Sequence, residues 1–216
     1  MQLKKVHTKI DSLQKKHGEK NLCAIYGAGC IRNPKVMFIF MNPTAKNISA
    51  HKTWKGMRAP WLGTKNVWKL FYKTSVISKI LFEKIKTLNQ REWTQTFALQ
   101  LYTEIANKKV YITNLAKCTQ LDARPLKNYV FENYLEILYK EIEHINPKII
   151  ITFGNQVSSI ILRKPITVSS YTNTKHETLQ IKDRLFSIYP VYYPVGQGMR
   201  NMSRAIQRIR YIIKGR

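Results

Sequence analysis

Four short runs with the composition of buried strands constrain this chain more than any other feature. They span Lys35–Met41, Lys109–Thr113, Lys148–Phe153 and Phe186–Tyr192. Each run is dense in β-branched or aromatic residues, and continuous apolar runs of this length suit parallel strands that are covered on both faces. Pro190, inside the last run, indicates that this strand is short or lies at an edge of the sheet.

Segments of helical periodicity separate and follow these runs, with apolar residues recurring at intervals of three and four. The predicted helices cover Lys65–Glu83, Trp93–Asn107, Leu126–Ile145, Asn155–Leu162 and Asn201–Ile213. Alternation of strands and helices predicts a parallel sheet with helices on both sides. We therefore expect an α/β fold, a three-layer α/β/α sandwich with a central four-stranded, mainly parallel sheet.

The chain contains no repeat, linker or low-complexity segment at which it could be divided. Its 216 residues, 44% of them hydrophobic, suit one domain with a full core. We expect a single domain over residues 1–216, with residues 1–20 as an amphipathic helical extension. The apolar runs are far below the ~20 residues of a membrane span, and the N-terminus lacks a signal-peptide core. These features predict an intracellular protein without a membrane partner, and we expect a monomer.

The charge of the chain points to a polyanionic partner. Lysine and arginine number 37 against 12 acidic residues, which gives a formal charge of +25. Such a charge destabilises the folded chain through self-repulsion, and nucleic acid is the usual partner that offsets it. The basic residues are spread along the chain and are not confined to a tail. Nucleic acid is therefore the favoured partner, and an anionic membrane surface is the weaker alternative.

Polar residues and glycines follow each of the four predicted strands. These segments are Asn42–Thr44, Asn114–Lys117, Gly154–Gln156 and Tyr193–Gly198. In an open parallel sheet, ligands bind outside the carboxyl ends of the strands. The sequence therefore predicts a ligand site at this edge of the sheet.

Five segments of the chain resemble, in order, motifs of the uracil-DNA glycosylase superfamily. They are Phe38–Thr44, Arg58–Thr64, Val110–Cys118, Asn146–Gln156 and Tyr193–Met202. The first is similar to the motif of the mismatch-specific and single-strand-selective branches, and others are similar to the iron–sulfur branches. The resemblance runs from about residue 22 to the end. It implies a monofunctional DNA glycosylase that flips uracil, or a related deaminated base, out of DNA and hydrolyses its N-glycosidic bond.

The resemblance assigns catalytic roles to Asn42 and Tyr193. Asn42 would position the hydrolytic water, which an amide can orient but cannot deprotonate. The alternative for Asn42 is an Asn-Pro turn that ends the strand. Tyr193 stands where the family has histidine, and its phenol could donate a hydrogen bond to the leaving base or its ring could simply wall the pocket.

The expected contacts with the flipped base are Trp61, Asn114 and Met41. Asn114 would accept a hydrogen bond from N3–H of uracil and donate one to O4, a pattern that cytosine does not match. Trp61 would stack on the base. The alternatives are a turn or helix cap for Asn114 and a core aromatic for Trp61.

A second set of residues is expected to bind the DNA strand. It consists of Lys117, Gly196, Gln197, Gly198, Met199 and Arg200. Glycines and free backbone N–H groups at the start of a helix favour phosphate binding. Met199 could wedge into the gap that the flipped base leaves, and Arg200 could pair with a phosphate.

The cysteines do not complete the iron–sulfur site of the related branches. Cys23 and Cys118 match two cluster ligands, but Tyr134 stands at the fourth position. No His, Cys and Asp cluster has convincing metal-ligand spacing. We therefore expect no cofactor and no metal.

Two alternatives to a glycosylase remain open. One is a nucleic-acid-binding module on the same fold, in which Tyr193 and the altered first motif, with Phe40 and Thr44 where glycine is usual, have removed catalysis. The other is a different α/β enzyme that acts on nucleic acid or nucleotides. Excision of a base separates the glycosylase from the binding module, and both predict an affinity for DNA that falls steeply with salt.

Overall fold

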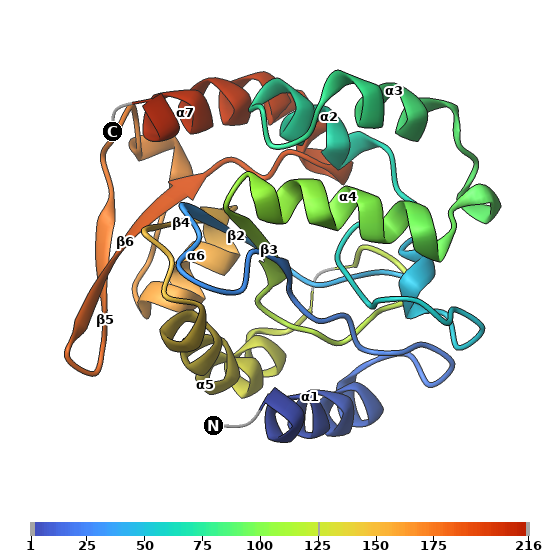
Figure 1. Ribbon diagram of the computed structural model, residues 1–216. Coiled ribbons are helices and arrows are strands. Elements are labelled where there is room, and N and C mark those ends of the chain that lie inside the picture. Colours follow the sequence, from blue (N-terminus) through green and yellow to red (C-terminus); the bar gives the residue numbers. More distant parts are fainter. Residues whose placement is uncertain (1–2, 125, 215–216) are drawn as a thin grey trace.

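The structure, a computed structural model, describes residues 3–124 and 126–214 and shows three layers with a sheet in the middle (Figure 1). The strands are β1 Ala28–Gly29, β2 Val36–Phe40, β3 Val110–Asn114, β4 Ile149–Phe153, β5 Glu177–Ile181 and β6 Arg184–Val191. The α-helices are α1 Leu3–His17, α2 Asn66–Lys73, α3 Lys79–Thr87, α4 Gln95–Asn107, α5 Asn128–Ile145, α6 Asn155–Leu162 and α7 Met202–Lys214.

The sheet has six strands in the order β1-β3-β2-β4-β6-β5. Its four central strands, β3, β2, β4 and β6, are parallel and correspond to the four predicted runs. The prediction of four strands is wrong in number, because β1 and β5 add an antiparallel strand at each edge. β1 has only two residues, and β5 alternates exposed and buried positions, so neither forms a continuous apolar run.

Strand β6 is not an edge strand, contrary to the expectation from Pro190. It pairs with β4 on one side and with β5 on the other. The last pair of the β5–β6 hairpin joins Glu177 to Ile188, two residues before the proline. Pro190 lies beyond the part of β6 that β5 covers, so its missing N–H costs the hairpin no hydrogen bond.

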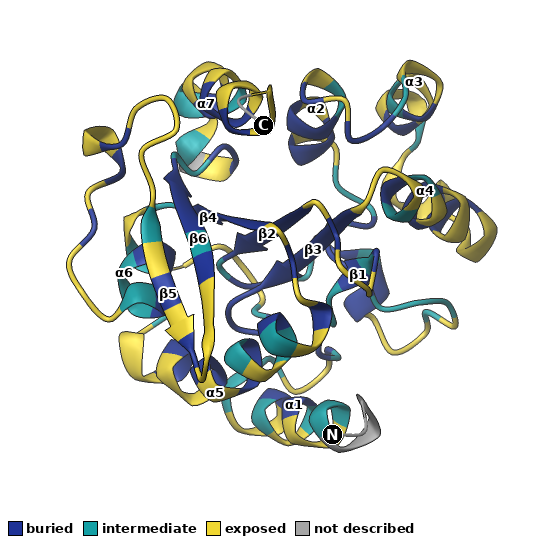
Figure 2. Cartoon of the chain, turned by 60° about the vertical axis from the view of Figure 1, so that its left-hand side comes forward, coloured by how far each residue is buried: buried dark blue, intermediate teal, exposed yellow. Residues whose placement is uncertain are grey.

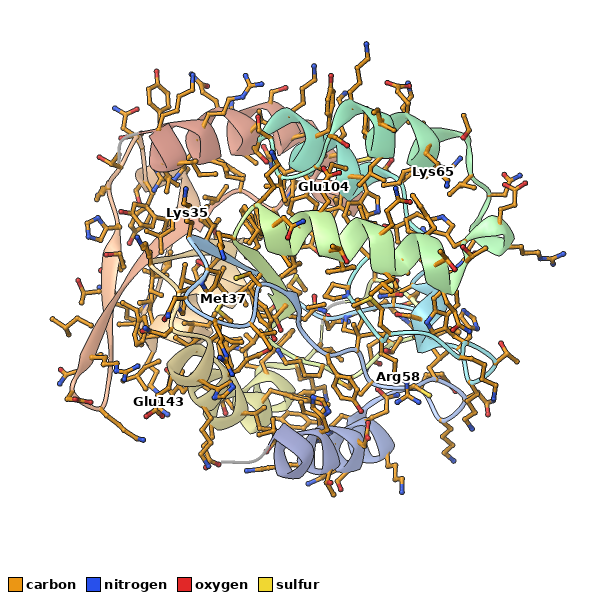
Figure 3. The ribbon with its side chains drawn as sticks, in the orientation of Figure 1. Lys35, Met37, Arg58, Lys65, Glu104 and Glu143 are labelled. Atoms are coloured by element: carbon orange, nitrogen blue, oxygen red, sulfur yellow. The ribbon has the colours of Figure 1, made fainter. Side chains whose placement is uncertain are left out.

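Helices cover both faces of the sheet, and the buried strands lie between them (Figure 2). Alternation along each strand sends Phe38 and Phe40 to a core shared with α2, α3, α4 and α7. It sends Met37 and Ile39 to a second core shared with α1, α5 and α6. Met37 accordingly lies well inside the molecule (Figure 3). The strands are therefore apolar on both faces, which explains their unbroken hydrophobic runs.

The predicted helices are present with shifted ends, except that Lys65–Glu83 forms two helices. The chain turns between α2 and α3 at Ser75, which has a φ of +61°. Ser78 then caps α3, since its hydroxyl accepts a hydrogen bond from the Leu81 N–H. The expected N-terminal helix is α1, which packs on α5, while residues 1 and 2 lie outside the described residues. Among the described residues, no helix is long and apolar enough to span a membrane.

Candidate base-binding site

The carboxyl ends of the parallel strands bring four predicted or neighbouring side chains onto one face of the sheet. Phe40 ends β2 beside Asn114, which ends β3 in register with it. Phe153 ends β4, and Tyr193 follows β6 by two residues. Phe40, Phe153 and Tyr193 all pack in the core under α2 and α7. Lys35 marks the opposite, amino end of β2 (Figure 3).

Asn114 is buried, with 2% of its surface exposed, yet its Oδ1 has no hydrogen-bond partner among the described residues. Leaving a buried acceptor unpaired costs about 1–3 kcal/mol, so such an atom needs an explanation. No helix follows Asn114 directly, which removes the helix-cap alternative. The side chain is therefore free to accept a hydrogen bond from an N–H group of a ligand.

Trp61 reaches the same place from the loop before α2. It has a φ of +67°, and its carbonyl accepts hydrogen bonds from the N–H and hydroxyl of Thr64. Its ring meets Phe40 edge to face, with the ring centroids 4.9 Å apart. Its Nε1 is buried without a partner among the described residues. Trp61 is thus a partly buried core aromatic beside Phe40, and its stacking on a flipped base stays a prediction.

Asn42 lies two residues beyond Phe40 and is 8% exposed. Its Nδ2 donates to the carbonyl of Pro43 at 3.1 Å, which turns its Oδ1 away from that carbonyl. The same carbonyl accepts the N–H of Gln120 at 3.0 Å, so the segment after β2 is tied to the segment after β3. β2 ends at Phe40, and Asn42 and Pro43 lie in an irregular segment with no assigned turn. That the Asn42 amide orients a water stays a prediction.

Tyr193 fits between two glycines. A β-carbon at Gly198 would lie 2.1 Å from the carbonyl oxygen of Tyr193, and one at Gly154 would lie 3.5 Å from the Tyr193 β-carbon. The Tyr193 ring lies 6.4 Å from that of Phe40. Burial raises the pKa of the Tyr193 phenol to about 12, so the hydroxyl stays protonated and can donate a hydrogen bond at physiological pH.

The family model described as Uracil DNA glycosylase superfamily matches residues 26–210 of the 216. The chain belongs to the uracil DNA glycosylase superfamily. Members of this superfamily are hydrolases of N-glycosyl bonds and act as DNA glycosylases in base excision repair. The match confirms the resemblance and includes every candidate site residue. No curated protein matches the chain.

Met41 directly follows β2 in this glycosylase fold. Its side chain packs against the core on the α5 and α6 face, whereas Phe40 and Asn114 belong to the other face. Successive side chains of a strand point to opposite faces, and Met41 continues the alternation of β2. The Met41 side chain therefore lies on the opposite face from Asn114, and a contact between Met41 and the base stays a prediction.

The loop before α7 of this superfamily member has the exposure expected of a DNA contact. Residues Gly196–Asn201 form a 3-10 helix, in which Gly196 has a φ of +59°. Met199 is 49% exposed, although large apolar side chains are usually buried, and its sulfur accepts a hydrogen bond from Asn66 of α2. Arg200 is exposed. The Gln197 side chain lies outside the described residues, so its predicted DNA contact has no structural counterpart here.

Lys117 is not on the DNA-facing surface. Its side chain is 1% exposed, and its Nζ lies 2.6 Å from Oε2 of Glu141 on α5. A phosphate cannot reach this ammonium, so the expected DNA contact is wrong. Glu141 is the functional candidate that sequence reasoning missed. An acidic residue directly before the buried Ile142 of a periodic helix was the available signal.

The cysteine positions do not fit an iron–sulfur cluster. Cys118 is buried, and burial raises the pKa of its thiol. At the fourth position stands the Tyr134 phenol, whose pKa is raised by burial and by Cys118. Among the described residues, no group of three or more His, Cys, Asp or Glu could hold a metal ion. That the chain works without a cofactor stays a prediction.

Proposed function

We propose that this chain is a monofunctional DNA glycosylase that removes uracil, or a related deaminated base, from DNA. The observation that carries the proposal is the unpartnered Oδ1 of Asn114, buried at the end of β3 in a chain of the glycosylase superfamily. N3–H of uracil supplies the donor that this acceptor lacks. Cytosine has no hydrogen at N3 and would leave the atom unpaired, which sites of this kind reject strongly.

In the proposed reaction, water held by the Asn42 amide attacks C1′ of the flipped nucleotide. The bond between C1′ and N1 of the base breaks, and its electron pair leaves with the base. The sugar passes through an oxocarbenium-like state, while negative charge develops on the departing base. The protonated Tyr193 hydroxyl donates a hydrogen bond to that charge. The water leaves its O–H on C1′, and its other proton ends on the released base anion. The chain forms no covalent bond to the sugar, so the products are the free base and an abasic site in an intact strand.

The charge of the protein supports DNA as the partner. Its +25 formal charge favours phosphate binding that weakens as salt rises. The exposed Met199 lies in the loop before α7, where it would fill the space that the flipped base vacates. Arg200, the next residue, would pair with a phosphate beside the gap. We propose that a single copy of the chain binds the damaged DNA.

One observation favours a binding module without catalysis as the second candidate. Phe40 is fully buried and lies against Trp61, Phe153 and Tyr193, with its ring stacked on that of Phe153 at 4.2 Å. The ring therefore takes up room among the residues that are proposed to contact the base. If the space that remains does not admit a base, the chain binds DNA and excises nothing.

Excision from an end-labelled oligonucleotide with a single uracil, followed by alkaline cleavage of abasic sites, tests the proposal. The parent protein should produce a cut at the uracil, and Asn42→Ala and Asn114→Ala should lose it. Asn133→Ala, an exposed position on α5, is the matched control and should cut like the parent. Salt-dependent binding with no cut at uracil, hypoxanthine or xanthine, in single or double strands, would favour the binding module.

A further inference from the structure

A buried ion pair lies behind the candidate site. Lys117 and Glu141 have 1% and 12% of their side-chain surface exposed, and Nζ of the lysine lies 2.6 Å from Oε2 of the glutamate. Burying two charges costs several kcal/mol per ion, and this cost is offset only when the pair is close and its other polar atoms are hydrogen-bonded. Such a pair is weak evidence for stability, and holding a particular conformation is the alternative role for it.

The hydrogen bonds of the pair converge on the end of β3. Besides Glu141, the Lys117 ammonium donates to the hydroxyl of Thr113 and, at 2.5 Å, to the backbone carbonyl of Asn114. The three N–H groups of the ammonium thus match three acceptors. The other carboxylate oxygen of Glu141 accepts hydrogen bonds from the hydroxyl groups of Tyr111, at 2.7 Å, and Thr113, at 3.1 Å. The network therefore fixes the backbone at Asn114 against α5.

The Asn114 side chain has no comparable support on the face where it would meet a base. Its Oδ1 has no partner among the described residues, so its position follows from the backbone that carries it. The next two residues tie the same backbone to the first motif. The N–H of Leu115 donates to the Phe40 carbonyl at 2.7 Å, and that of Ala116 donates to the Met41 carbonyl at 3.0 Å. These two hydrogen bonds hold the backbone after Asn114 against the segment that leads to Asn42.

We propose that Lys117, held by Glu141, is a positioning residue that sets the Asn114 amide for recognition of the flipped base. The inference rests on the proposed function, because it gives Asn114 a base to read. Neither Lys117 nor Glu141 touches substrate. A polar group that is fixed before the ligand arrives discriminates between bases without the cost of ordering it at each encounter.

The decisive experiment combines Lys117→Met/Glu141→Gln with Asn114→Ala. The double variant removes both charges, so neither partner is left buried and unpaired. Lys9→Met/Glu136→Gln is the matched control, since this pair also involves α5, at 2.9 Å, but is exposed, and Glu136 pairs only with Lys9 and Lys140 among the described residues. Single-turnover uracil excision, affinity for abasic-site DNA and thermal unfolding are measured for each protein.

We expect the double variant to excise uracil about 10- to 100-fold more slowly, because small displacements of a positioning group have effects of this size. It should bind abasic DNA like the parent, since no base remains to be read. Asn114→Ala should lose nothing more when the Lys117→Met/Glu141→Gln changes are added to it, because the ion pair acts through the Asn114 side chain. The control pair should alter neither rate nor affinity. Excision by the double variant at the parent rate, or losses that multiply in the triple variant, would overturn the proposal.

The Asn114 side-chain amide provides a measurement that does not depend on activity. Its ¹⁵N–¹H resonances are assigned by their absence in Asn114→Ala. They should be sharp in the parent and in the control variant, and broadened or split in Lys117→Met/Glu141→Gln. Unchanged resonances would overturn the positioning role. If the parent excises no base, the proposed function fails, while these resonances still decide whether the ion pair orders Asn114.

Discussion

Replacing Phe40 with alanine tests whether its ring shapes the base site, and Phe38→Ala provides the matched control. Both side chains are fully buried on the same face of β2. The ring centroid of Phe38 lies 5.4 Å from that of Phe71 and 5.9 Å from that of Phe153. The ring centroid of Phe40 lies 6.2 Å from that of Phe71 and 4.2 Å from that of Phe153. Only Phe40 is also in ring contact with Trp61 and Tyr193.

The stability losses of the two variants should be similar. Truncating a fully buried phenylalanine to alanine costs about 3–5 kcal/mol in lost burial and cavity formation. With a urea m-value of about 2 kcal/mol/M, the unfolding midpoint of each variant should fall by about 1.5–2.5 M. Equilibrium urea unfolding followed by circular dichroism measures this. Activity is assayed at a low temperature at which both variants are folded.

Their activities should differ. Space opened beside Trp61 and Tyr193 should let Phe40→Ala accept larger bases, so its preference for uracil over hypoxanthine should fall at least tenfold. Phe38→Ala should keep the preference of the parent, because Phe38 lies two residues before Phe40 on β2 and its cavity would open farther from Trp61 and Tyr193. The assay is excision of each base from matched oligonucleotides under single-turnover conditions. Equal changes of preference in the two variants would refute the assignment of Phe40 to the site.

Four further predictions concern Tyr193, Met199 and Arg200. Tyr193→Phe should slow excision about 10²-fold, the loss typical of one removed donor to a developing anion, and a parent-like rate would mean that the ring only walls the pocket. Burial raises the pKa of Tyr193 from its ordinary value of 10 to about 12, so the contribution of this group to the free energy of unfolding is fully present below pH 10 and is lost, by up to about 3 kcal/mol, as pH rises to about 12. Between pH 9 and pH 12, the free energy of unfolding measured with a chemical denaturant should therefore fall less for Tyr193→Phe than for the parent. Met199→Ala should weaken binding to a flipped base more than binding to undamaged duplex, and Arg200→Gln should reduce the salt slope of DNA binding by about one unit, both measurable by fluorescence anisotropy. Equal weakening on both DNAs would contradict a wedge role for Met199.

The location of the site could be predicted from the sequence because parallel strands share one polarity. Each buried run ends in polar residues or glycine, and a parallel arrangement brings those ends to the same edge of the sheet. Asn42 and Tyr193 do follow the parallel strands β2 and β6, and Asn114 is the last residue of the parallel strand β3. The roles expected of them came from the family resemblance. The helices could be predicted because their periodicity is a local property of the chain.

The edge strands and the break between α2 and α3 escaped prediction for different reasons. β1 has two residues, and it exists because they align with Tyr111 and Ile112, more than 80 positions away. β5 has exposed alternate positions, so its pairing with β6 sets its identity more than its own composition does. The break between α2 and α3 lies at Ser75, which has a left-handed backbone conformation. Serine does not favour this conformation as glycine does, so its residue type does not predict the break.

The α/β class, the four parallel strands and the edge at which the polar residues meet could be predicted from the sequence, because each depends on local pattern and on strand polarity. The three-dimensional packing was needed to show that the Met41 side chain lies on the opposite face from Asn114 and that Lys117 lies inside, bound to Glu141 of α5. A lysine after a strand has the same local sequence whether it faces DNA or the core. The difference comes from a carboxylate 24 residues away, which the packing of α5 against β3 brings within 2.6 Å.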